Sequence, residues 1–336
     1  MCYKVINNVQ SYLFRNIEME EKISDAKKEA IDELVIEICM HVKGIGKAIA
    51  GAIAADFDGD LQAFLESNAT RLSQLYKTSG KPLIAGELLT GLMETKSQVP
   101  KGLSPQETWV FYIGREFLKL QIEMVSSLGF RDFDINPLLA KALNLDTPRK
   151  VVSFNVYQTI TRSVVTSWGY AVQQMAKRIG SCYDNDYEGS TGTNFDLIKN
   201  IAGYDYYIQI KSGPNDMNVG MVKSLNKEIK ELERKKVGSK AILGMTYGTR
   251  SRISTQITGN LLGGPDKMKI GSELWDFLSE TDNFHKNLFK LLDGSSKGLL
   301  NSSFIDLIEA KVKELEGFWV KNYTDKSVDE VLEKYI

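Results

Sequence analysis

The sequence predicts an α+β protein in which a small mixed β-sheet is flanked by helices and an all-α region comes first. Apolar residues recur at three- and four-residue spacing through roughly the first 145 residues, as in amphipathic helices. Short runs rich in β-branched and aromatic residues follow, and the pattern becomes helical again near the end. The order is helices, then helix–strand–strand–helix–strand, then helices, which favours one small sheet with helices packed around it.

The first half of the chain is expected to consist of helices joined by short connections. Residues 21–42 show the helical spacing, and a long amphipathic helix is predicted from Ser104 to a stop at Gly129. A break is expected at Pro148, followed by a second long helix over residues 151–179. We place a domain boundary at this break.

The sheet is expected in the second half of the chain. The predicted strands cover residues 194–199, 204–211, 240–247 and 268–270. Ala202 and Gly203 predict a tight turn between the first two strands. Asn215 or Asp216 is expected to cap a helix that joins the second strand to the third. Further helices are predicted over residues 272–278 and 284–336.

Composition and charge indicate an ordinary soluble globular protein. The 336 residues are 43% hydrophobic and 25% charged, which is enough to form a core of normal size. A formal net charge of -1 argues against a uniformly basic coat for nucleic acid, but it allows a local basic groove. The most apolar stretch, residues 35–55, contains His41, Lys43 and Lys47, so no membrane span is expected. No secretion signal is recognisable.

Cysteine and histidine usage narrows the chemistry. Cys2, Cys39 and Cys182 form no CxxC pair, so we expect reduced thiols in a cytoplasmic protein and no zinc site. His41 and His285 are the two histidines, and neither has a partner at metal-binding or catalytic spacing. Mechanisms that depend on histidine are therefore poorly supported, and both side chains are expected to be structural or at the surface.

The central candidate site is a carboxylate and a lysine on two adjacent predicted strands. Asp196 lies on the first strand, and Gln209, Ile210 and Lys211 end the second. Side chains alternate along a strand, so Gln209 and Lys211 share a face that the hairpin can bring against Asp196. An acidic group and backbone or amide oxygens can hold Mg²⁺ at a phosphate, while a lysine orients the attacking water. The alternative is a strand-end aspartate and two solvated side chains.

With its flanks, this pattern resembles the PD-(D/E)xK nuclease superfamily, and within it type II restriction endonucleases of the TdeIII-like group. Asp196 stands for the first acid, with Phe195 in place of the proline, and residues 209–211 stand for (D/E)xK. The segments 211–218, 247–248 and 273–278 are similar to the same group. The resemblance implies Mg²⁺ held by Asp196, Gln209 and the Ile210 carbonyl, with Lys211 as the catalytic cation.

Gln209 departs from the family pattern, which has an acid at this position. A neutral amide leaves the metal site with less negative charge, so another carboxylate is expected to contribute. Glu188 is the first candidate, followed by Asp184 and Asp186. The helix before the core, where relatives carry a glutamate, has glutamines at 173 and 174.

A second signal for DNA lies near the N-terminus. The segment from Lys43 through Gly44 and Gly46 to Lys47 lies between two apolar helical runs, and residues 35–66 resemble a helix-hairpin-helix module. Glycines permit a tight turn, and the amides that begin the next helix can receive a phosphate oxygen. Such contacts hold DNA without reading its sequence. A plain helical hairpin with a glycine turn is the alternative.

Other basic residues are candidates for base or phosphate contacts. Arg250 and Arg252 follow the third strand, where a loop can reach the major groove. Lys223 belongs to a lysine-rich helix that can line a DNA channel. Arg162, on the long helix before the sheet, is a candidate for an interface or backbone contact, and a buried ion pair is an equal alternative. Ordinary surface charges are the alternative for Arg250, Arg252 and Lys223.

Together with these observations, the resemblance implies a type II restriction endonuclease that cuts both strands of a short palindromic site in double-stranded DNA and leaves 5′-phosphates. Residues 1–148 would serve DNA binding and dimerisation, and residues 149–336 would form the nuclease domain. A palindromic target implies a two-fold homodimer, and a cognate DNA methyltransferase is the expected functional partner. The alternatives are a repair or phage nuclease without sequence specificity and a catalytically degenerate DNA-binding protein.

Overall fold

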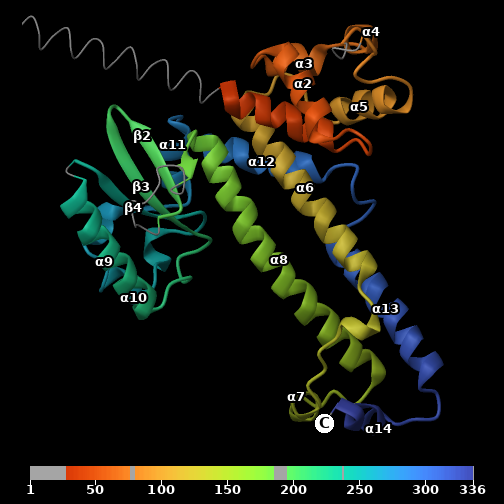
Figure 1. Ribbon diagram of the computed structural model, residues 1–336. Coiled ribbons are helices and arrows are strands. Elements are labelled where there is room, and N and C mark those ends of the chain that lie inside the picture. Colours follow the sequence, from red (N-terminus) through yellow and green to blue (C-terminus); the bar gives the residue numbers. More distant parts are fainter. Residues whose placement is uncertain (1–27, 76–79, 185–194, 237, 336) are drawn as a thin grey trace, which may run out of the picture.

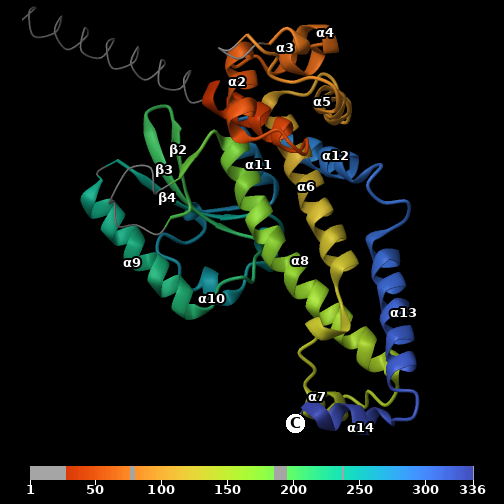
Figure 2. The ribbon, with the colours of Figure 1, turned by 45° about the vertical axis from the view of Figure 1, so that its right-hand side comes forward.

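The computed structural model describes residues 28–75, 80–184, 195–236 and 238–335. Long helices form an elongated frame. A group of short helices lies at one end of the frame, and a small sheet lies beside the frame (Figure 1). The second view shows the same separation between the sheet and the far end of the frame (Figure 2).

The short helices at the N-terminal end form their own core. They are a helix over residues 28–40, α2 (Lys47–Phe57), α3 (Leu61–Glu66), α4 (Ala69–Ser73) and α5 (Glu87–Ser97). Leu34, Ile38, Ile53 and Phe64 are fully buried in this core. The helical pattern predicted for residues 21–42 is confirmed from residue 28 to residue 40, and its earlier part lies outside the described residues.

The frame is built on two long helices. The first, α6 (Pro105–Ser127), begins with a capping box in which Ser104 and Glu107 satisfy each other's backbone amides. The second, α8 (Pro148–Gly180), begins with Thr147 as its cap. Pro148 therefore starts this helix three residues earlier than predicted, because the first helical turn does not need the amide hydrogen that proline lacks.

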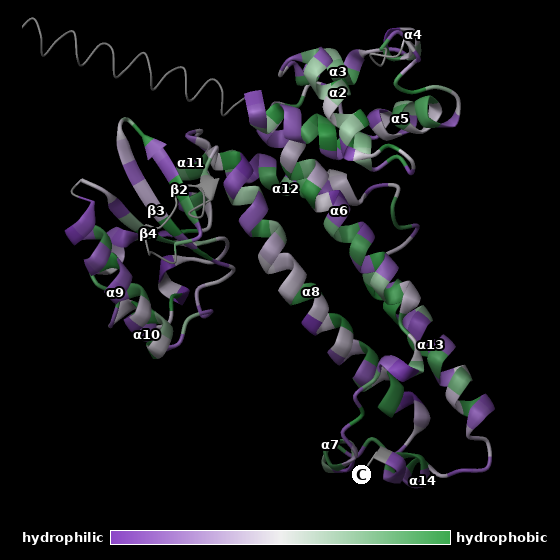
Figure 3. Cartoon of the chain, in the orientation of Figure 1, coloured by the Kyte–Doolittle hydropathy of each residue, from purple (hydrophilic) through white to green (hydrophobic). Residues whose placement is uncertain are grey.

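Later helices complete the frame. The short α7 (Pro137–Ala142) links α6 to α8, and α12 (Phe284–Ser296) and α13 (Phe304–Asn322) pack beside them. The C-terminal α14 (Val328–Leu332) lies next to α7 at the far end (Figures 1 and 2). Hydrophobic and hydrophilic residues are mixed along α6, α8 and α13 (Figure 3). Within the described ranges, no helix combines the length and apolar character that crossing a membrane requires.

The sheet is mixed, as predicted, and its strands follow one another in sequence order. The strands are β1 (Tyr183–Asp184), β2 (Leu197–Ile201), β3 (Tyr204–Lys211), β4 (Lys240–Met245) and β5 (Met268–Ile270). The pairs β1–β2 and β2–β3 are antiparallel, and β3–β4 and β4–β5 are parallel. The predicted turn between β2 and β3 is confirmed, with φ of 51° at Ala202 and 82° at Gly203.

Helices cover both faces of the sheet. Leu197, Ile208 and Ile242 pack with α8 and with α11 (Ser272–Ser279). The opposite face carries Phe195 and Tyr207 and packs against α9 (Val219–Lys235), with the short α10 (Thr255–Thr258) beside it. These two faces determine where each polar side chain of β3 points.

The start of α9 differs from the prediction. Asn218 is its cap and accepts a hydrogen bond from the Met221 amide at 3.0 Å. Asp216 instead accepts from the Gly213 amide at 2.6 Å and so fixes the turn between β3 and α9. The helix begins later than expected because this turn uses the earlier polar side chain.

The domain boundary at residue 148 stays a prediction. Val110 and Phe111 of α6 are nevertheless buried in the same cluster as Ile208 of β3. The helix before the expected boundary therefore contributes to the core beneath the sheet.

Candidate active site

The β2–β3 hairpin brings Asp196 against Gln209. Leu197 pairs with Ile208 in the antiparallel β2–β3 register, so Asp196, just before Leu197, lies opposite Gln209. The Asp196 amide donates to the Ile208 carbonyl at 3.0 Å. The Asp196 carboxylate accepts from the Ile210 amide at 2.6 Å and from the Gln209 side-chain amide. The predicted contact between the acid and the end of β3 is therefore present.

Lys211 shares the face of β3 that carries Gln209 and Tyr207. Alternation places these three side chains on the side covered by α9. Carbonyl directions also alternate, so the Ile210 carbonyl points to the same edge as that of Ile208, which bonds Asp196. One carboxylate, one amide, one carbonyl and one ammonium thus gather at the end of β3.

Lys211 differs from the buried lysine of the same hairpin. The Lys199 ammonium is committed to the Gly180 carbonyl and to Glu280, each at 2.8 Å. Lys211 is half-buried, and its ammonium has no hydrogen-bond or ion-pair partner among the described residues. Its charge instead reaches Asp196, where it lowers the pKa of the carboxyl. Lys211 is therefore available to a substrate in a way that Lys199 is not.

The pKa of Asp196 is raised overall, and burial is the largest cause. The bond from the Ile210 amide, the Lys211 charge and the bond from Gln209 oppose this rise, whereas the negative charge of Glu228 adds to it. A buried carboxylate beside another negative charge gains from a bound cation, which relieves both penalties.

Glu228 is a residue that the sequence analysis missed. It is half-buried on α9, next to Ile229, which packs in the same cluster as Phe195 of the Asp196 segment. In the sequence it is one charge in a helix of many charges. The signal available in the sequence was its position at the border of the apolar face of the helix. That position points to the Asp196 site only once α9 is known to pack against β3.

The oxygen ligands fit a hard divalent ion, but the described set is small. Asp196, Gln209 and the Ile210 carbonyl offer oxygen atoms, the ligand type that Mg²⁺ prefers. Within the parts of the chain that the structure describes, no three His, Cys, Asp or Glu side chains form a metal-binding group. Glu188 and Asp186 lie outside the described residues, and the Asp184 side chain is also outside them.

The sequence of the chain matches a known protein family. The family model described as type II restriction endonuclease EcoO109I matches residues 111–299, which is more than half of the chain. The chain belongs to this family. It is therefore a site-specific deoxyribonuclease, which binds DNA. The more specific TdeIII-like grouping stays a prediction, and no curated protein sequence matches the chain.

The matched segment of this restriction endonuclease contains Asp196, Gln209 and Lys211. It also contains most of the frame and the whole sheet, from α6 to α12. Restriction endonucleases of this type generally use divalent metal ions, in agreement with the oxygen ligands at the end of β3.

The structure gives Arg250 a partner within the endonuclease. Its guanidinium donates to both carboxylate oxygens of Glu273, at 2.8 and 2.6 Å, and to the Pro265 and Met268 carbonyls, each at 3.2 Å. Arg252 is exposed, and its side chain has no partner among the described residues. Of the two predicted arginines, Arg252 is therefore the one whose guanidinium is available to DNA.

The helix-hairpin-helix-like element lies on the short-helix end of the molecule, away from the sheet (Figures 1 and 2). Lys43 and Lys47 are both exposed. Gly44 has a φ of 102°, and Gly46 precedes the first residue of α2. This element and the Asp196 site are thus separate surfaces, and its contact with DNA stays a prediction. Lys223, on α9, is exposed on the sheet side of the molecule.

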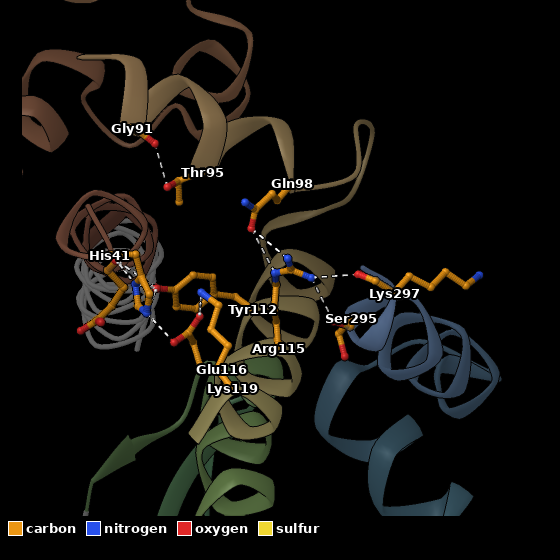
Figure 4. A network of polar contacts seen from close by, with 11 residues as sticks. His41, Gly91, Thr95, Gln98, Tyr112, Arg115, Glu116, Lys119, Ser295 and Lys297 are labelled. Atoms are coloured by element: carbon orange, nitrogen blue, oxygen red, sulfur yellow. Dashed lines mark hydrogen bonds and ion pairs between the residues drawn. The ribbon is translucent and has the colours of Figure 1, made fainter. Parts of the chain in front are cut away.

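His41 connects this N-terminal element to the frame through side-chain contacts with α6 (Figure 4). It contacts the Tyr112 hydroxyl, and its Nε2 lies 2.5 Å from a carboxylate oxygen of Glu116; both partners are on α6. Burial raises the pKa of Glu116, but hydrogen bonds with His41 and Lys119 outweigh it and hold the value below the usual range. These contacts agree with the structural role expected for this histidine.

Arg115 continues the network on the other side of α6. It donates to the Gln98 side chain after α5, at 2.9 Å, and to the Lys297 carbonyl after α12, at 3.1 Å (Figure 4). The short-helix end is therefore held to the frame through side chains of α6 on two sides. A ligand that binds this end would bind a part of the protein that is attached to the nuclease core.

Proposed function

We propose that this restriction endonuclease uses Mg²⁺ to hydrolyse both strands of a short palindromic site in double-stranded DNA, leaving 5′-phosphates. The observation that carries the proposal is the meeting of Asp196, Gln209 and Lys211 on one face of the β2–β3 hairpin. The family match makes DNA the substrate, and the oxygen-rich site favours a hard cation over zinc.

The roles follow from the position of each group. Asp196, the Gln209 side-chain oxygen and the Ile210 carbonyl would hold the ion, and Glu188 is proposed to supply further charge. When bound, Mg²⁺ lowers the pKa of its water and stabilises charge on the phosphate. Lys211 orients the attacking water and stabilises the negative charge that develops on the phosphate oxygens.

A palindromic site presents two equivalent phosphates related by a two-fold axis. One active site per chain then requires two chains with the same symmetry, so the proposed enzyme is a homodimer. A cell that holds such an enzyme must protect its own copies of the site. We therefore propose a cognate DNA methyltransferase as the functional partner, in the cytoplasm.

The test is incubation of the protein with plasmid DNA and Mg²⁺, alongside Lys211→Ala. Discrete fragments with 5′-phosphate ends from the wild type, and a loss of roughly 100-fold or more in Lys211→Ala, are expected. Lys321→Ala, which changes an exposed lysine on α13, is the matched control and should cut normally. Smeared products would indicate a nuclease without sequence specificity, binding without cutting would indicate a degenerate DNA-binding protein, and normal cutting by Lys211→Ala would remove that lysine from the mechanism.

A further inference from the structure

Tyr247 lies two residues after the end of β4, next to the segment that follows Lys211. Lys211 pairs with Met245 in the parallel β3–β4 register, and both strands end at this pair. After the strands, the Thr246 amide donates to the Lys211 carbonyl at 3.0 Å and the Tyr247 amide donates to the Ser212 carbonyl at 3.3 Å. These bonds hold Tyr247 against the segment that directly follows Lys211, at the rim of the Asp196–Lys211 site.

The phenol end of Tyr247 is folded back over Gly213. A Cβ atom at Gly213 would lie 2.5 Å from the Tyr247 hydroxyl oxygen and 2.6 Å from the ring carbon that carries it. Glycine is therefore required for the ring to lie there. The Gly213 amide is in turn held by Asp216 at 2.6 Å, so the phenol lies on a turn with a fixed conformation.

This placement leaves the hydroxyl accessible. Tyr247 is 58% exposed. The hydroxyl has no hydrogen-bond partner in the portion of the chain that the structure describes, and it can both donate and accept. An exposed donor on the turn that follows Lys211 is suited to an anionic oxygen.

We propose that the Tyr247 hydroxyl donates a hydrogen bond to a DNA phosphate next to the scissile one and so positions the strand for attack. The inference rests on the proposed function, because it places the scissile phosphate at Asp196 and Lys211. Tyrosine hydroxyls are among the groups that contact DNA phosphates, and such contacts fix register without reading bases. Tyr247 is thus a positioning residue that takes no part in the bond-breaking step.

The first measurement compares Tyr247→Phe with the wild type in single-turnover cleavage of a duplex that carries the site found from plasmid fragments. Removing one hydrogen bond to a charged group should slow cleavage by roughly 5- to 30-fold. Tyr204→Phe is the matched control, because Tyr204 is an exposed tyrosine at the opposite end of β3. It should cut at the wild-type rate.

The second measurement asks whether the loss acts through a phosphate. Single phosphates on either side of the cleaved bond are replaced by uncharged methylphosphonates. One replacement should slow the wild type clearly and slow Tyr247→Phe much less, because that variant has already lost the contact. A purely structural role for the hydroxyl would leave the penalty at every position equal in the two proteins.

The outcomes separate the two proposals. If the wild type cuts and Tyr247→Phe cuts equally fast, or if no phosphate shows a reduced penalty in the variant, the role of Tyr247 is wrong and the proposed function stands. If the wild type does not cut DNA with Mg²⁺, both are wrong.

Discussion

The side-chain amide of Gln209 donates a hydrogen bond to the Asp196 carboxylate across the β2–β3 hairpin. In the (D/E)xK pattern that residues 209–211 resemble, the position of Gln209 is acidic, and two carboxylates would then repel each other here until a cation separated them. The amide removes this repulsion in the metal-free protein, but it also removes one negative charge from the proposed site.

Gln209→Glu should therefore strengthen Mg²⁺ binding and make the stability of the protein depend more on the bound ion. We expect the Mg²⁺ concentration for half-maximal cleavage to fall by about tenfold, because a charged oxygen ligand binds the ion more tightly. The metal-free variant should unfold more easily, by about 1–2 kcal/mol, since it gains a carboxylate beside Asp196. Titration of cleavage with Mg²⁺ and urea unfolding with a chelator test both effects. An unchanged Mg²⁺ requirement would mean that position 209 does not face the ion.

The carboxylate that compensates for the neutral Gln209 can be identified by replacing each candidate with glutamine. We expect Glu228→Gln to raise the Mg²⁺ requirement by about tenfold, because the Glu228 charge already acts on Asp196. Glu231→Gln is the control, since that residue pairs with Lys235 on the same helix. Glu188→Gln, tested in parallel, should also raise the requirement if the sequence-based proposal is correct. A change with Glu188→Gln and none with Glu228→Gln would assign the second carboxylate to Glu188.

The helix-hairpin-helix-like element should reveal itself through the salt dependence of DNA binding. If Lys43 and Lys47 both contact phosphates, Lys43→Ala/Lys47→Ala should weaken binding and reduce the slope of log K against log salt by about 2. Lys313→Ala/Lys321→Ala removes two exposed lysines from α13 and serves as the control. Binding measured at several salt concentrations gives both slopes. Equal slopes for the wild type and the first variant would exclude phosphate contacts at this element.

The two arginines after β4 should behave differently. Arg250→Ala should lower stability by about 1 kcal/mol with its main effect on folding, because the side chain joins Glu273 and two carbonyls. Arg252→Ala should leave stability unchanged and weaken DNA binding, since the exposed guanidinium has no contact to lose among the described residues. Urea unfolding and DNA affinity, measured on both variants, test this difference. Weaker binding with Arg250→Ala at unchanged stability would reverse the assignment.

Much of the fold could be predicted because local signals were strong. The β2–β3 turn at Ala202 and Gly203 and the capped start of α6 at Ser104 are encoded by neighbouring residues, and both appear as expected. The meeting of Asp196 and Gln209 followed from strand alternation, which needs no tertiary information.

Other features depend on packing between distant elements and could not be predicted in this way. Glu228 approaches Asp196 only because α9 crosses over the sheet, and Tyr247 reaches Gly213 only through the β3–β4 register. The partner of Arg250 lies 23 residues away on α11, so the sequence leaves it looking like a free surface arginine.

Lys96 provides a test of stability that is independent of DNA. It is 4% exposed, donates to the Ser67 carbonyl at 2.6 Å and lies over the Phe64 ring. Burial lowers the pKa of Lys96 to about 8, and burial raises the pKa of the adjacent Cys39 thiol to about 12. Between pH 8 and 9 the unfolded lysine keeps a proton that the folded one loses, so the folded state gains stability as pH rises. Above pH 9 the unfolded thiol ionises while the folded thiol does not, and the gain stops.

We therefore expect the free energy of unfolding of the wild type to rise relative to that of Lys96→Met by about 1 kcal/mol between pH 8 and 9. Above pH 9 the variant keeps the effect of Cys39 alone, so its stability should fall while that of the wild type stays level to about pH 10.5. Lys101→Met, at an exposed position after α5, should follow the wild type throughout. Urea unfolding at half-unit steps from pH 7 to 10.5 measures the three curves. Parallel curves for the wild type and Lys96→Met would show that Lys96 has the same pKa in the folded and unfolded chains.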